Sequence, residues 1–110
     1  MALNIEDLLS KMLEAAKDDL KKKWPKVAPI AKEQFIGLSR IFVNIENDKM
    51  KGAIKEDEAK ELMEMHRNAV KGALKTVEGI GAILAESAIN AALGAVKSVV
   101  NTAIGWRLIP

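Results

Sequence analysis

Residues 79–103 decide the fold and read GIGAILAESAINAALGAVKSVVNTA. Charged residues are rare from Gly79 to Pro110, where only Glu86, Lys97 and Arg107 occur. Small residues recur here at spacings of 4, 3, 4, 3, 4 and 4, close to the heptad seam of a coiled coil: Gly81, Ala85, Ala88, Ala92, Ala95, Val99 and Ala103. Helices with such a face approach each other below the usual separation of about 8–10 Å, because no large side chain holds them apart. We therefore predict that this small-residue seam is an interaction surface.

A polar row follows another side of the same stretch, because Glu86, Asn90, Lys97 and Asn101 are separated by 4, 7 and 4 residues. The favoured interpretation is a helix packed on two faces with one hydrated stripe. A membrane or lipid-surface helix is the second, since residues 79–96 approach the ~18 apolar positions of a membrane span. Against it, each charged residue in hydrocarbon costs about 2.5–3.5 kcal/mol. A buried proton or ion path is the third, and nothing else in the chain supports it.

Helical periodicity extends toward the N-terminus, and no segment shows the two-residue alternation of a strand. It predicts a helical hairpin over about 4–23 and 27–47, a loop over 48–54 and a long helix over about 55–105. The Asn4 side chain is suited to cap the first helix. The negative charges of Glu6 and Asp7 lie near the positive end of the helix dipole and stabilise it. The chain is expected to be one all-α domain over residues 1–110, arranged as an antiparallel helical bundle.

Residues 78–81, Glu-Gly-Ile-Gly, pose the main structural choice. Each glycine disfavours a helix by about 1 kcal/mol relative to alanine, which favours a turn. The apolar stripe nevertheless passes through Val77, Ile80 and Leu84 without losing phase, and this favours a continuous or kinked helix. Such a helix would be about 75 Å long and its partners only about 30 Å, so that another copy would have to cover it. A break would instead give a monomeric bundle of four helices.

The amino-acid composition excludes some classes of function but does not identify the function of the protein. The chain has 110 residues and no cysteine, which excludes disulfides and thiolate chemistry. Its net charge, 17 − 15 = +2, does not indicate nucleic acid. The Lys21–Lys23 run beside Trp24 is explained by a helix end, where cations suit the dipole. The acidic start does not resemble a signal peptide, so a cytoplasmic location is expected.

His66 is the only histidine, and it is predicted to pack rather than to catalyse. Its neighbours three and four residues away are Leu62, Met63, Ala69 and Val70, with no carboxylate among them. The Glu-x-x-His pair of dimetal helical bundles is therefore missing. We predict no catalytic, cofactor-binding or metal-binding residues, and no cofactor.

The segment from Asn47 to Glu58 imitates a calcium loop, because Gly52 and Glu58 fall at positions 6 and 12. Positions 3 and 5, which supply oxygen ligands in such loops, are Lys49 and Lys51. Two lysines repel a divalent cation. The segment is therefore interpreted as a connection between helices.

The sequence predicts a non-catalytic helical protein that acts by self-association or partner binding through its Ala- and Gly-rich C-terminal helix. A homodimer is the favoured form, and another protein partner is the variant. The alternative function is a lipid-surface or membrane-active protein that uses the same stretch. A small-ligand or enzyme site between helices is the third hypothesis.

We expect no calcium binding at millimolar concentration, since Lys49 and Lys51 remove two ligands and add positive charge. Isothermal titration calorimetry checks this. A saturable signal that disappears in Glu58→Gln would contradict it.

Overall fold

The apolar stripes of the sequence meet in one core built by four helices. The computed structural model describes residues 2–110. Its helices are α1 (Ile5–Leu20), α2 (Trp24–Met50), α3 (Glu56–Lys75) and α4 (Gly81–Ile104), and the short 3-10 helix η1 (Lys21–Lys23) joins α1 to α2. Residues 2–110 contain no β-strand. The predicted all-α class is confirmed.

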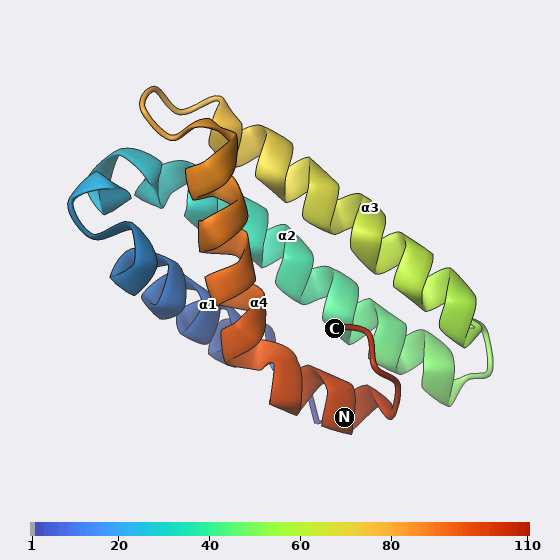
Figure 1. Ribbon diagram of the computed structural model, residues 1–110. Coiled ribbons are helices and arrows are strands. Elements are labelled where there is room, and N and C mark those ends of the chain that lie inside the picture. Colours follow the sequence, from blue (N-terminus) through green and yellow to red (C-terminus); the bar gives the residue numbers. More distant parts are fainter. Residues whose placement is uncertain (1) are drawn as a thin grey trace.

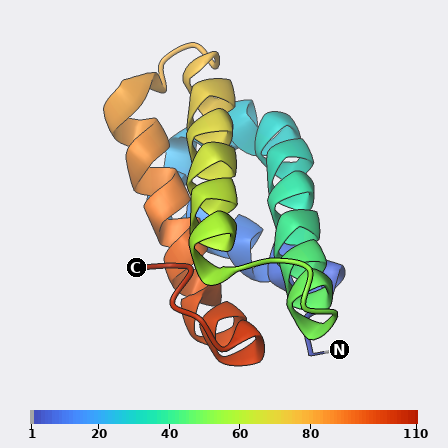
Figure 2. The same cartoon turned by 90° about the vertical axis from the view of Figure 1, so that its right-hand side faces the viewer.

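Successive helices run antiparallel, so the chain goes up, down, up and down (Figure 1). α1 contacts α2 and α4, and α3 contacts the same two helices, which closes the bundle. Figure 2 shows α2, α3 and α4 side by side with α1 behind them. The bundle measures 43 × 22 × 20 Å, about the proportions of helices of 16–27 residues at 1.5 Å per residue.

The start of the chain follows the predicted capping chemistry. The Asn4 side chain accepts a hydrogen bond of 3.0 Å from the Asp7 amide. The α-helix then ends at Leu20 rather than at residue 23, because Lys21 adopts φ 51° and starts the turn of η1. α2 begins at Trp24, earlier than predicted, with Pro25 in its first turn where a missing amide costs nothing.

The predicted long helix over 55–105 is divided at the turn Thr76–Ile80, so the continuous form that we favoured is not adopted. Gly79 and Gly81 have φ of 85° and 60°, which a right-handed helix does not allow. The Lys23 ammonium of η1 donates to the Gly79 carbonyl at 2.9 Å and fastens the turn to the start of α2. Ile80 is buried although it lies in the turn, and this explains why the apolar sequence pattern continues there without a helix.

The other turn, between α2 and α3, is shorter than the predicted loop over 48–54 because α2 continues to Met50. α3 begins at Glu56, where the Glu58 carboxylate accepts the Lys55 amide at 2.9 Å.

The core between the turns is aliphatic apart from two phenylalanines of α2, and its largest fully buried side chains are Phe35, Phe42, Leu8, Met12, Leu38, Ile45, Leu74, Ile89 and Ile104. The buried hydroxyl of Ser39 is satisfied by the Phe35 carbonyl at 2.8 Å.

Ala92→Leu tests the close packing of α4. Ala92 is fully buried, so three added carbons must displace neighbouring helices, and overpacking of this kind costs about 1–3 kcal/mol. Urea unfolding should show that loss. The control Ala82→Leu adds the same group at an exposed position of α4 and should change stability by about 0.5 kcal/mol or less. Equal effects of both substitutions would contradict the packing.

Candidate functional site

The small-residue seam divides between the core and the surface. Ala85, Ala88 and Ala92 are buried within the bundle. α4 makes its most extensive contact with α1, and Ser87 pins the two helices together by donating to the Asp19 carboxylate at 2.8 and 2.9 Å. These three alanines are covered by the chain's own bundle in this structure, and the binding of another molecule by the seam stays a prediction.

The other four seam residues lie nearer the surface. Gly81 and Ala95 are exposed, Val99 is 37% exposed and Ala103 is half-buried. Ala95 lies in a shallow depression of about 260 Å³ between α4 and α1. Only this part of the predicted seam remains accessible to a partner.

A second line of small residues, which the sequence analysis missed, runs beside the seam on the solvent side of α4. We call it the outer strip; it consists of Ala91, Ala95, Ser98 and Thr102. Its spacings of 4, 3 and 4 place these residues on one face of the helix. None of them is charged, and three of them are exposed. The spacing was visible in the sequence, but only the position of α1 shows which of the two lines remains free.

The first half of the polar row faces α3 and is occupied by an ionic cluster. Arg67 of α3 contacts the Glu86 carboxylate at 2.5 Å and the Asn90 side-chain oxygen at 2.6 Å. The Lys71 ammonium lies 2.8 Å from the other Glu86 oxygen. Hydrogen bonds from Lys71 and Arg67 lower the pKa of Glu86 to about 2. This half of the row therefore joins α4 to α3.

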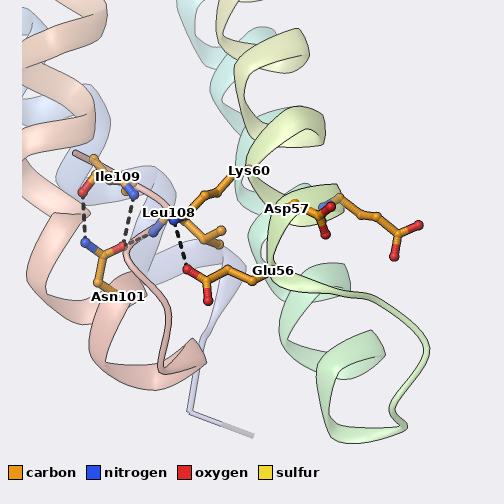
Figure 3. Close-up of polar contacts among 7 residues, drawn as sticks. Glu56, Asp57, Lys60, Asn101, Leu108 and Ile109 are labelled. Carbon is orange, nitrogen blue, oxygen red and sulfur yellow. Dashed lines mark hydrogen bonds and ion pairs between the residues drawn. The ribbon is translucent and has the colours of Figure 1, made fainter.

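The second half of the row holds the end of the chain. The Asn101 side chain accepts the amides of Leu108 and Ile109 at 3.1 and 3.0 Å and donates to the Ile109 carbonyl at 2.9 Å (Figure 3). Segment 105–110 thereby folds back along the bundle, and Leu108 and Ile109 become buried. Lys97 remains exposed. Three residues of the row, Glu86, Asn90 and Asn101, thus make contacts within the chain, where the favoured interpretation expected a hydrated stripe.

Lys49, one of the lysines in the imitation calcium loop, caps α4. Its ammonium donates to the Ile104 carbonyl and lies 4.7 Å from the centre of the Trp106 ring. Gly105 ends the helix at φ 84°, and a side chain there would place Cβ 2.7 Å from the Lys49 ammonium. The positive φ is therefore the reason that glycine is favoured here, since the flexible Lys49 side chain could move aside. Residues 47–50 are helical, so the segment does not form a calcium-loop backbone.

Titratable groups do not gather into a reactive centre in the part of the chain that the structure describes. His66 is half-buried on α3 and forms no hydrogen bond within residues 2–110. No three side chains of the metal-binding types cluster there either. The buried Glu46 has a structural task, since its carboxylate accepts the amides of Ala2 and Leu3 at 3.2 Å. The accessible features with distinct chemistry are the outer strip and a groove beside segment 105–110.

Comparison with known proteins does not assign a family. No family model, curated protein or solved structure matches the chain.

Glu86→Gln tests the ionic cluster through its pH dependence. Because the folded-state pKa of about 2 lies below the ordinary 4.5, the charged carboxylate stabilises the fold above pH 4.5. That contribution should disappear as the pH falls from 4.5 through 2. We expect wild type to be more stable than Glu86→Gln at pH 7 and the two to converge near pH 2, as measured by urea unfolding. A difference that is constant over this range would contradict the cluster.

Proposed function

We propose that this protein is a non-catalytic module that self-associates through the outer strip of α4. The observation that carries the proposal is the incomplete burial of an apolar helix. α4 is long and apolar enough by composition to span a membrane, yet only 39% of its most apolar window is buried. Ile83 is 85% exposed, and Val99 beside the outer strip is 37% exposed. Such a surface is typical of a helix that has a further partner.

The surroundings of the strip suit a second copy of the chain. The depression at Ala95 is bordered by Ala15 of α1, whose small side chain permits close approach of another helix. Lys11, Glu14 and Asp18 also line it and supply both signs of charge. In a two-fold dimer a contact from one residue to a different residue of the other copy occurs twice, so opposite charges away from the axis can be paired across it. We therefore favour a symmetric dimer of complete bundles.

The exposed apolar part of α4 also supports a second candidate, a lipid-surface protein. The same window that is 39% buried in the bundle is the one that meets the length and composition of a membrane span. Glu86 and its partners Arg67 and Lys71 oppose insertion, because burying that cluster in hydrocarbon is costly. Sedimentation with lipid vesicles separates the two candidates: the self-association proposal predicts that the protein stays in solution.

Light scattering tests the self-association. We expect twice the 12.0 kDa chain mass at tens of micromolar protein, and the mass of one chain for Ala95→Glu, because the longer side chain holds the helices apart and its carboxylate must be desolvated on dimerisation. Ala69→Glu is the matched control, since it places the same group on an exposed position of α3. It should leave the mass unchanged.

A wild-type mass of one chain at this concentration would overturn the proposal. So would an unchanged mass in Ala95→Glu, because the strip would then lie outside the interface. Circular dichroism of both variants should show wild-type helix content, since both positions are exposed.

A further inference from the structure

A groove lies between α3, α4 and segment 105–110. It is on a different side of α4 from the depression between α4 and α1 that contains Ala95 of the outer strip. It consists of two adjoining cavities of about 310 and 360 Å³, within the range of small-ligand pockets. Glu64, Arg67, Leu93 and Pro110 line both cavities. Their shared lining makes the two cavities one continuous groove.

Apolar side chains and charged side chains both line the groove. Met63, Leu93 and Leu108 are buried side chains whose remaining surface lines the first cavity. Three cations, Lys60, Arg67 and Arg107, line the same cavity together with the carboxylate of Glu64. The lining thus combines hydrocarbon with charged groups of both signs.

The cations differ in what they already bind. Arg67 is held by Glu86, and Lys60 lies 2.8 Å from Glu56 of the same helix. Figure 3 shows that pair on the part of α3 beside Leu108. Arg107 is exposed, and no carboxylate among residues 2–110 forms an ion pair with it. Arg107 is therefore the guanidinium that is free to bind an external anion, and its planar fork suits a carboxylate.

We propose that this groove binds a single-chain amphiphile with an anionic head group, of the kind represented by a medium-chain fatty acid. Arg107 binds the head group with Lys60 beside it, and the chain lies along Met63 and Leu108 and past Leu93, which lines both cavities, into the second cavity beside Gly94. The size of the two cavities fits a narrow chain rather than a helix of a protein partner, whose diameter is about 10 Å. The proposal is independent of the self-association.

Segment 105–110 forms one wall of the groove, because Arg107, Leu108, Ile109 and Pro110 all line it. The segment is held in place by the three hydrogen bonds of Asn101, which does not itself line either cavity. Asn101 is therefore a positioning residue for the site. Bound amphiphile should reciprocally hold the segment, which amide hydrogen exchange at Leu108 and Ile109 measures.

Calorimetric titration with decanoate, below the concentration at which it forms micelles, tests the charge preference. We expect saturable binding of decanoate and none of decyltrimethylammonium, which has the same chain and the opposite charge. Arg107→Gln should weaken decanoate binding by about tenfold or more, the loss expected for one charge-assisted hydrogen bond. Arg40→Gln, on an exposed position of α2, is the control and should bind like wild type.

Filling the groove tests its location. Gly94 lines the second cavity, and a Cβ at this position meets no atom within 4 Å. Gly94→Leu should therefore fold normally and lose decanoate binding. Gly37→Leu is the matched control, because Gly37 is an exposed helical glycine of α2 with equally open surroundings. It should retain binding, and so should Ala95→Glu in the outer strip.

Three results would overturn the proposal: no decanoate binding, equal binding of both amphiphiles, or undiminished binding in Arg107→Gln and Gly94→Leu. Sedimentation with anionic phospholipid vesicles separates a free amphiphile from a membrane surface as the source of the ligand. Binding to such vesicles without binding of free decanoate also overturns it. Reduced hydrogen exchange at Leu108 on addition of decanoate supports it.

Discussion

The packing of the small-residue face of α4 against α1 is the interaction on which the bundle depends. It joins the first and last helices of the chain and turns three successive hairpins into a closed arrangement. Ala85, Ala88 and Ala92 of α4 are buried in the bundle, and Ser87 hydrogen-bonds to Asp19 of α1. Because alanine loses no side-chain entropy on burial, a close contact of this kind orders two helices at little conformational cost.

Polar side chains fix the positions of the backbone segments that the apolar core does not hold. Glu46 holds the backbone at Ala2 and Leu3, Lys49 caps the end of α4, and Asn101 folds segment 105–110 onto the bundle. These contacts satisfy backbone groups that lie in the last turn of α4 or outside the regular helices. Such groups are costly to bury without a partner, so a few side chains decide where the ends of the chain run. The groove proposed to bind an amphiphile exists only because one of these segments is held in place.

Sequence patterns predicted where the helices lie in the chain better than which helices pack against each other. The cap at Asn4, the helical hairpin and the seam of α4 follow from local chemistry and from periodicity, which are properties of neighbouring residues. The turn at Gly79 was underestimated because Ile80 continues the apolar phase although the backbone reverses there. The seam itself does not specify whether α1 or a second copy covers it. Arg107 and Leu108 join α3 in one groove only after the chain folds back, so no local pattern marked that site.

The chain contains no cysteine, which permits a direct test of where the seam of α4 lies. Asp19→Cys combined with Ser87→Cys replaces two side chains that hydrogen-bond between α1 and α4. The hydrogen-bonded side chains hold positions 19 and 87 within side-chain reach, so a short bifunctional thiol cross-linker, which does not need the about 3.5–4.5 Å Cβ separation of a disulfide, should join them within one chain in dilute solution. Non-reducing electrophoresis and mass spectrometry should then show a cross-linked single chain. Exclusive formation of cross-linked dimers would mean that α4 packs on another copy, and would contradict the closed four-helix bundle.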